Sequence, residues 1–312
     1  MEEKPYLVTV IMSTYNGHEY IEQQLESLLI QQGVRINLFV RDDGSKDNTI
    51  ELIKLYSNKF NSLTIISEAN IGATASFHRA AKLSLNSEIT EYYAFCDQDD
   101  IWLEDKLITG IRKISHLDNK YPNLYFSNLM MMNNDGDLLG TLLDNSLVSC
   151  SSYNALAAIY AYGCTCVFNR SALEKFCCLP EANRYIYHDN WMYSICCFMG
   201  TVFYDQNSYM RYRQTGSNVS GEKKTGLSIW IQRLSKLFNL SEDKRIYESI
   251  AQNLVDSFQN QLNREDYIFL KRICNYRSSC KDKVYLLITK RMKTNRYTKN
   301  ACIIGRILLN RL

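Results

Sequence analysis

The densest group of potential ligands in this 312-residue chain is Asp97-Gln98-Asp99-Asp100, which has three carboxylates in four residues. It follows Tyr92 to Cys96, an apolar run that predicts a buried strand. Carboxylates this close repel one another, and a hard divalent cation would neutralise them while leaving positions for phosphate oxygens. The alternative is structural, because acidic residues favour the start of a helix and Asp100 would serve a helix beginning near Leu103.

Polar residues also follow two other predicted strands. Asp42-Asp43-Gly44-Ser45 comes after Ile36 to Val40, and it is either a turn or a site where a carboxylate accepts a hydrogen bond from a nucleobase or ribose. The run 13–17, Ser-Thr-Tyr-Asn-Gly, comes after Leu7 to Met12 and matches neither glycine-rich motif for dinucleotides or triphosphates. Its Tyr15 would stack on a base or pack within the loop.

A fourth polar group, His188-Asp189-Asn190-Trp191, opens a predicted helix. Asp189 would either cap that helix or act as a general base that takes a proton from a hydroxyl.

The elements around these groups alternate between strand and helix, which predicts a doubly wound, mostly parallel α/β sheet. Ligands bind beyond the carboxyl ends of strands in such sheets, where three of the four polar groups lie. We expect strands at 7–12, 36–40, 63–66, 92–96, 124–132, 163–169 and 201–211, and helices at 20–29, 50–56, 73–85, 103–117 and 189–199. Residues 213–226 have the composition of a loop, and 227–312 read as helices.

Composition reduces the number of possible functions. The net charge of +3 gives no support for nucleic-acid binding, and 46% hydrophobic residues predict a folded core. The eleven cysteines form no C-x-x-C pair, and the four histidines suggest no zinc site. The chain shows no signal peptide and no apolar run long enough to span a bilayer, so we expect a cytoplasmic protein. Its late basic residues form either a solvated face or a peripheral contact with an anionic membrane.

Several of these motifs together resemble family 2 glycosyltransferases, especially the bacterial rhamnosyltransferase-like subset. The resemblance spans residues 8–218. It is carried by the runs 8–17, 41–49 and 95–102, by Asn70-Ile71-Gly72 and Gly163-Cys164-Thr165, by 188–191, and by Tyr212-Arg213-Gln214-Thr215-Gly216-Ser217-Asn218.

The resemblance implies a GT-A fold over residues 1–226, with a nucleotide-binding half at 1–117 and an acceptor-binding half at 118–226, followed by a helical region at 227–312. It implies Mn²⁺ or Mg²⁺ held by Asp97 and Asp99, and Asp189 as catalytic base. The nucleotide-sugar site would comprise Thr14, Tyr15, Asn16, Asp42, Asp43, Asn70, Gly72, Asp97, Gln98, Gly163, Cys164, Thr165 and Arg213.

The implied reaction is inverting transfer of a sugar from a nucleotide diphosphate sugar, such as dTDP-rhamnose or a UDP-hexose, to a hydroxyl of a growing polysaccharide or lipid-linked glycan. The chain departs from the subset at Thr215, where a histidine is usual, and at Asn190 and Glu104. Two alternatives are a catalytically impaired protein that binds nucleotide sugars and a sugar nucleotidyltransferase, although the latter would need a glycine-rich, basic loop after the first strand.

Overall fold

The computed structural model describes residues 4–87, 89–214 and 245–312. Within these residues nine strands form one sheet, in the order β3-β2-β1-β4-β8-β6-β9-β5, with β7 paired to β6. The strands are β1 (Tyr6–Thr14), β2 (Val34–Asp42), β3 (Ser62–Ser67), β4 (Tyr92–Cys96), β5 (Ile101–Trp102), β6 (Asn123–Met132), β7 (Leu138–Thr141), β8 (Cys166–Asn169) and β9 (Thr201–Arg213).

The predicted parallel sheet is confirmed, and its two halves differ. Strands β3, β2, β1 and β4 are mutually parallel, with Val10 opposite Leu38 on one side and Ala94 on the other. Beyond β4 the sheet is mixed, because β8 runs antiparallel to both β4 and β6 while β9 runs parallel to β6. As a result β1, β2, β3, β4, β6 and β9 share one direction, and their carboxyl ends meet at one edge.

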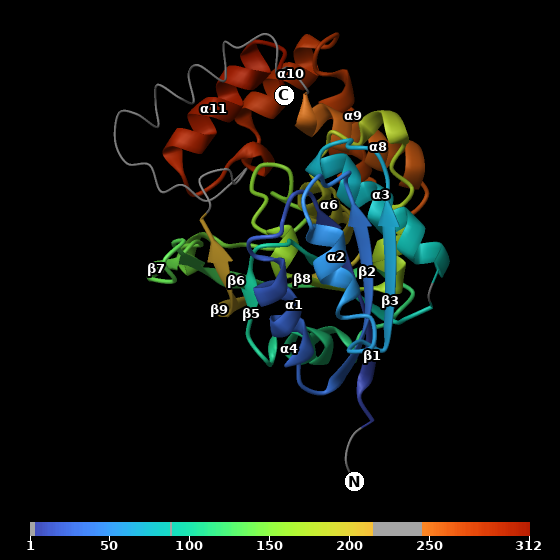
Figure 1. Cartoon of the computed structure of the whole chain (residues 1–312). Helices are drawn as coiled ribbons and strands as arrows, with labels where there is room; N and C mark the ends of the chain where they lie inside the picture. The colour runs from blue at the N-terminus through green and yellow to red at the C-terminus, as the bar shows by residue number, and fades with distance from the viewer. Residues whose placement is uncertain (1–3, 88, 215–244) are drawn as a thin grey trace.

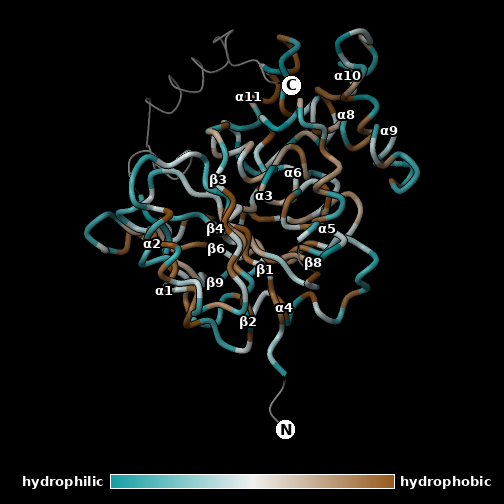
Figure 2. Tube along the Cα trace, turned by 45° about the vertical axis from the view of Figure 1, so that its right-hand side comes forward, coloured by the Kyte–Doolittle hydropathy of each residue, from teal (hydrophilic) through white to brown (hydrophobic). Residues whose placement is uncertain are grey.

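Helices cover both faces of the sheet. This is required because successive side chains of β4 point to opposite faces and are buried on both. Tyr93 and Phe95 face one hydrophobic core, while Tyr92, Ala94 and Cys96 face the other. The second core is covered by α1 (Ile21–Leu29), α2 (Thr49–Lys54) and α4 (Lys106–Ile114), and the first by α3 (Ala73–Ser87), α5 (Arg170–Phe176) and α6 (His188–Met199). Figure 2 shows the hydrophobic trace concentrated along the central strands.

The C-terminal helices extend the first core. They are α8 (Ile246–Phe258), α9 (Arg264–Asn275), α10 (Cys280–Ile288) and α11 (Tyr297–Leu308). Leu254, Leu270 and Ile307 belong to the same buried cluster as Trp191 of α6. Figure 1 shows these helices gathered at the end of the molecule opposite the N-terminus. Among the described residues, no helix combines the length and the apolar character that crossing a bilayer requires.

Two local expectations were wrong. The helix expected from Leu103 begins at Lys106, because Ile101 and Trp102 form β5 and pair with Arg211 and Met210 of β9. The strand expected from Gly163 begins at Cys166, because Gly163–Thr165 form a 3-10 turn. Most of the predicted loop 213–226, Thr215 included, and the proposed boundary between 226 and 227 lie outside the described residues.

Candidate active site

A cleft of about 750 Å³ lies at the carboxyl ends of β1, β2 and β4. Eleven of the residues predicted from sequence line it, and they come from six separate segments. These residues are Thr14, Tyr15, Asp43, Asn70, Gly72, Asp97, Gln98, Asp99, Gly163, Cys164 and Asp189. The remaining four, Asn16, Asp42, Thr165 and Arg213, are not among the lining residues and form hydrogen bonds in or next to the loops that carry them.

Gln98 joins the loop after β4 to the loop after β1. Its Oε1 accepts a hydrogen bond from the Tyr15 backbone N–H at 2.9 Å, and its Nε2 donates to the Tyr15 carbonyl at 3.1 Å. A Cβ on Gly17 would lie 2.3 Å from the Gln98 Oε1, so a larger residue there would displace the Gln98 amide. The Tyr15 ring itself is 46% exposed and open to stacking on a planar ligand.

Asn16 holds the loop after β1 against the loop after β2. Its backbone adopts the left-handed conformation with φ 46°, which asparagine tolerates better than most residues. The side-chain Oδ1 accepts from the Lys46 N–H at 2.8 Å, and the Asn16 N–H donates to the Ser45 hydroxyl at 2.9 Å. Asn16 therefore shapes the loop, and its predicted contact with the donor stays a prediction.

Asp42 shapes the neighbouring turn in a similar way, and its predicted contact with the donor stays a prediction. Its carboxylate is fully buried and accepts hydrogen bonds from the Thr14 hydroxyl at 3.0 Å and from the Gly44 and Ser45 N–H groups at 3.1 and 2.9 Å. With these donors its acceptor sites are used to fold the turn after β2. Of the two adjacent aspartates, Asp43 is the one that reaches the cleft.

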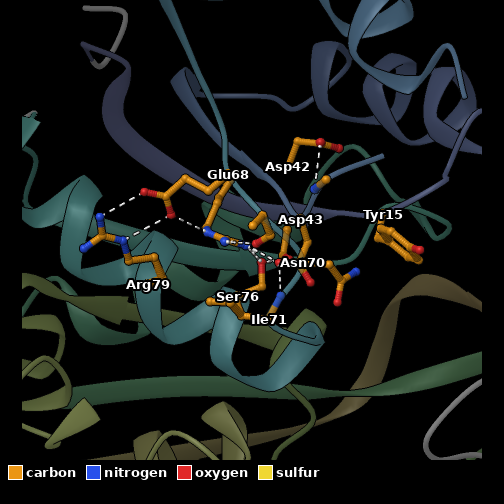
Figure 3. Close-up of polar contacts among 12 residues, drawn as sticks. Tyr15, Asp42, Asp43, Glu68, Asn70, Ile71, Ser76 and Arg79 are labelled. Carbon is orange, nitrogen blue, oxygen red and sulfur yellow. Dashed lines mark hydrogen bonds and ion pairs between the residues drawn. The ribbon is translucent and has the colours of Figure 1, made fainter. Parts of the chain in front are cut away.

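Asp43 orders the loop between β3 and α3 (Figure 3). Its carboxylate accepts from the Ile71 and Gly72 N–H groups, both at 2.9 Å, and from Arg41 Nη1 at 2.6 Å. Gly72 has φ +85°, a conformation that glycine adopts without strain. The loop that carries Asn70 into the cleft is thus fixed by one carboxylate from the neighbouring strand.

Sequence reasoning missed Arg41, the cation behind Asp43. Arg41 is 1% exposed, and its guanidinium also contacts Ser76 Oγ at 2.8 Å and Glu68 Oε2 at 3.1 Å. Glu68 in turn binds Arg79, which lies nearer the surface (Figure 3). The sequence held a signal, because an arginine at the end of an apolar strand and directly before two aspartates cannot be buried without a partner.

The three carboxylates after β4 are close enough to destabilise one another. Burial raises the pKa of Asp97, and the neighbouring Asp99 and Asp189 charges raise it further. Burial also raises the pKa of Asp99 and of Asp100. Asp100 caps no helix; one of its oxygens accepts from the Arg213 N–H at 3.2 Å, and Oδ2 is buried without a hydrogen-bond partner.

Arg213 supports this acidic loop from outside the cleft. Its Nε donates to the Asp99 carbonyl at 3.0 Å and its Nη2 to Gln23 Oε1 at 2.6 Å, and the guanidinium lies 4.5 Å from the Tyr20 ring centre. These contacts give Arg213 a role in positioning the acidic loop, and its predicted contact with the donor stays a prediction.

The acidic loop fits a divalent cation. Among the described residues, one group of candidate ligands has all its atoms within 4.8 Å of one another, and it consists of Asp97, Asp100 and Cys164. Asp99 lines the same cleft. Burial raises the pKa of the Cys164 thiol, so carboxylates supply the negative charge. A hard cation suits these oxygen ligands and would use the unpartnered Asp100 oxygen.

Lys106, which sequence reasoning also missed, compensates part of this charge. It is 1% exposed, its ammonium lies 3.5 Å from the Trp102 ring centre, and burial lowers its pKa to about 8. Its position six residues after Asp100, at the start of an amphipathic helix, gave no sign of burial. One lysine does not balance three carboxylates.

Asp189 faces the acidic loop from the start of α6. Its Oδ1 accepts from the Asn190 N–H at 2.7 Å, and burial raises its pKa to about 6. The adjacent His188 ring stacks on Phe77 at 4.1 Å, and a Cβ on Gly163 would lie 2.0 Å from its Nε2. Gly163 therefore permits the close approach of the turn to α6. The buried Thr165 hydroxyl donates to the Tyr162 carbonyl at 2.7 Å and shapes that turn. Its predicted contact with the donor stays a prediction.

A largely apolar wall completes the cleft, and sequence reasoning missed it. Its members are Phe77, Ile159, Ala161, Tyr162 and Tyr187. Residues 159–162 lie outside regular secondary structure, so no periodicity identified them.

Comparison with known proteins identifies this arrangement. Residues 9–177, more than half of the chain, match the family described as Glycosyl transferase family 2. The chain belongs to glycosyl transferase family 2. Its cleft is accordingly that of a glycosyltransferase, and the sequence resemblance is confirmed at the level of the family.

Relatives within glycosyl transferase family 2 agree. The dTDP-rhamnosyl transferase RfbG of Shigella flexneri is 29% identical over 295 residues, which cover 89% of this chain and 98% of RfbG. The glucosyltransferase WfgD of Escherichia coli, which is named for UDP-Glc and a diphosphoundecaprenol-linked GlcNAc, is 31% identical over 55% of this chain and 63% of its own.

Solved structures share the fold. TarS of S. aureus in complex with UDP superposes with a TM-score of 0.55 at 15% identity, covering 96% of this chain and 89% of TarS. The mannosyltransferase PcManGT of Pyrobaculum calidifontis, in complex with GDP-Man and Mn²⁺, gives a TM-score of 0.51 at 14% identity, covering 100% and 89%. The GT-A type of the fold is thereby confirmed.

Proposed function

We propose that this glycosyltransferase transfers a sugar, with inversion at the anomeric carbon, from a nucleoside diphosphate sugar to a hydroxyl of a polysaccharide or lipid-linked glycan. The observation that carries the proposal is that Asp97, Asp99 and Asp189, from segments about ninety residues apart, line one cleft. One wall then suits an anionic leaving group with its cation, and the other suits a base facing the acceptor.

The nucleoside would bind at the β1, β2 and β3 ends of the cleft. Tyr15 offers an exposed ring, Asp43 reaches the cleft as an acceptor, and Asn70 and Gly72 form the adjoining loop. The name of RfbG makes dTDP-rhamnose the first donor to test, and that of WfgD makes a UDP-hexose the second.

Asp97 and Asp99, with Asp100 and Cys164 beside them, would hold Mn²⁺ or Mg²⁺. When bound, the ion supplies neutralisation of the charge that develops on the departing diphosphate. The mannosyltransferase PcManGT, which shares the fold, was solved with Mn²⁺. Two hydrogen-bonding residues position the acidic loop for the ion. Arg213 binds the Asp99 carbonyl, and Gln98 links the loop to Tyr15.

Asp189 would act as general base. As the acceptor oxygen bonds to the anomeric carbon and the bond to the diphosphate oxygen breaks, the hydroxyl proton passes to the Asp189 carboxylate. A pKa of about 6 leaves this group ionised at neutral pH yet more basic than an ordinary aspartate. A single base opposite the leaving group gives one displacement, and hence inversion.

A donor screen tests the proposal. Purified protein is melted with nucleotide sugars and Mn²⁺, and a donor at a hundredfold excess over its Kd should raise the stability by about 2.7 kcal/mol. The stabilising donor is then incubated with candidate acceptors, and NMR of the product should show the inverted anomer. A retained anomer would refute the mechanism, and pyrophosphate release from a nucleoside triphosphate and a sugar phosphate would indicate a nucleotidyltransferase.

A further inference from the structure

The last thirty residues of the chain, 283–312, contain no aspartate or glutamate. They contain eight basic residues: Lys283, Lys290, Arg291, Lys293, Arg296, Lys299, Arg306 and Arg311. Since the whole chain carries +3, residues 1–282 carry −5, the difference between +3 and +8. All of these side chains except that of Arg291 are exposed or half-exposed. The net positive charge is therefore concentrated on residues 283–312, which cover most of α10, the segment after it and all of α11.

Both helices also expose apolar side chains at helical spacing. On α11, Tyr297, Ile304 and Leu308 are 92%, 40% and 55% exposed, and their separations of seven and four residues place them on one face. On α10, Val284 and Ile288 are 56% and 68% exposed and lie four residues apart. Single exposed apolar residues are common on protein surfaces, but a row on each of two packed helices is not.

Internal contacts hold these two helices in place. Lys283 Nζ of α10 donates to the Leu308 carbonyl at 3.2 Å and to Asn310 Oδ1 at 2.9 Å. The Leu312 N–H donates to the Tyr276 hydroxyl at 2.9 Å, and Leu312 is fully buried. The exposed rows thus belong to an ordered surface, because the end of the chain is docked.

Arg291 attaches this pair of helices to the body of the enzyme. It forms a buried ion pair with Asp266 of α9 and donates to the carbonyls of Ser152 and Tyr153 at 3.1 and 3.3 Å. Its guanidinium lies 4.0 Å from the Phe269 ring centre. Arg291 does not contribute to the exposed charge. It instead fixes the orientation of the surface that the other basic residues form.

We propose that α10, α11 and the segment joining them form a docking surface for an anionic lipid bilayer. Acidic headgroups would neutralise the basic side chains, while the apolar rows would enter the headgroup boundary, where a tyrosine such as Tyr297 is favoured. A second copy of the chain is a poorer occupant, because it would bring a second surface of the same charge. None of the side chains of this surface lines the donor cleft, although Arg296 lies within electrostatic reach of Tyr162 in the cleft wall. The proposal therefore does not depend on the identity of the donor.

Vesicle flotation of the full chain tests the surface. Vesicles of phosphatidylcholine with about a third phosphatidylglycerol should bind the protein, pure phosphatidylcholine should bind it weakly, and raised salt should release it. Lys290→Gln, Lys293→Gln and Arg296→Gln combined should lower partition to the acidic vesicles about a hundredfold. The control combines Lys54→Gln, Lys113→Gln and Lys120→Gln, three exposed lysines elsewhere, and should bind nearly as wild type.

A second variant separates apolar insertion from charge. Tyr297→Ser with Leu308→Ser should weaken binding while preserving its salt dependence, and circular dichroism confirms that each variant is folded. Equal binding to both vesicle types, absence of binding to the acidic vesicles, or an equal loss in the control would overturn the proposal. So would a dimer in light scattering that the charge variant dissociates, because the surface would then serve self-association.

Discussion

At the scale of single residues, the proposed chemistry depends on burial that shifts proton affinity. Asp189 sits at the start of a helix, where the helix dipole alone would favour its ionised form. Burial has the larger effect and raises its pKa to about 6. An ordinary solvent-exposed aspartate stays ionised well below that pH.

The pH dependence of transfer follows from this shift. A general base must be unprotonated, so kcat should rise as pH increases through about 6 and should fall about tenfold per unit below it. Initial rates measured between pH 5 and 8 with saturating metal and donor check this. Asp135→Asn, an exposed control, should keep the same profile, whereas a wild-type profile that is flat from pH 5 to 7 would exclude Asp189 as the titrating base.

Gly163 is a second residue whose identity is dictated by contact. In Gly163→Ala the new Cβ would meet His188 Nε2 at 2.0 Å, so the His188 ring and the adjacent Asp189 must shift. We expect a loss of about 1–3 kcal/mol in the free energy of unfolding, as overpacking produces, together with reduced kcat. Urea denaturation measures the first quantity.

The double-mutant cycle with His188→Ala provides the control for Gly163. If the clash with the ring is the cause, adding Gly163→Ala to His188→Ala should change stability little. An equal loss in both backgrounds would show that the turn itself, rather than the ring, rejects the methyl group.

At the scale of elements, the end of the cleft lined by Asp43 and Asn70 is held by one buried network that crosses β2, the β3–α3 loop and α3. Arg41 links Asp43, Glu68 and Ser76, and Asp43 in turn fixes the loop at Ile71 and Gly72. Removing one partner of a buried pair leaves the other charge uncompensated. Loss of one partner should therefore destabilise the whole network.

Arg41→Met tests this network. We expect it to lower the free energy of unfolding by about 3–5 kcal/mol, because Asp43 stays buried without its cation, and to weaken donor binding as the loop loosens. Arg79→Met is the matched control, since Arg79 is half-exposed and pairs with the same Glu68; it should lose about 1 kcal/mol or less. Equal losses in chemical denaturation would contradict the assignment.

The strands and most helices were predictable from sequence because they are long and strongly patterned. β4 was predicted at its observed ends, since five apolar residues precede the acidic cluster. The two-residue β5 was not predicted, because pairing with β9, more than a hundred residues away, leaves no local pattern. Because β5 was not predicted, the start of α4 was placed too early and Asp100 was assigned a capping role.

The candidate site divides along similar lines. Residue type and position at a strand end predicted which loops meet, and that prediction brought Asp97 and Asp189 into one cleft. The sequence pattern did not reveal which of two adjacent residues faces the cleft. Asp42 and Asp43 look alike in sequence, and only the hydrogen bonds of the folded loops distinguish a turn-forming carboxylate from one that reaches the cleft.

At the scale of the whole molecule, the acidic loop opposes folding unless its charge is neutralised. The pKa of Asp97 is raised above its ordinary value of 3.8 by burial and by neighbouring carboxylates, so the folded state binds this proton more tightly than the unfolded state. The stability contributed by the protonated group is therefore present at low pH and is lost as pH rises through the folded-state pKa.

The variant Asp97→Asn makes the contribution of Asp97 to the pH dependence of stability measurable. In the absence of metal, the variant should become more stable relative to wild type as pH rises from about 4 toward neutrality, and added Mn²⁺ should reverse the order because it stabilises only wild type. Thermal unfolding with EDTA or Mn²⁺ at several pH values records both effects. Asp135→Asn should show neither, and a pH-independent difference for Asp97→Asn would contradict the charge argument.

The central claim is that Asp189 performs the chemistry beside a separate donor site, and Asp189→Asn tests it most directly. Donor affinity by calorimetry and transfer rate are measured on the same preparation. We predict that the Kd for the donor stays within about threefold while transfer falls by about a hundred- to ten-thousand-fold. Transfer at the wild-type rate by the folded variant would contradict the account.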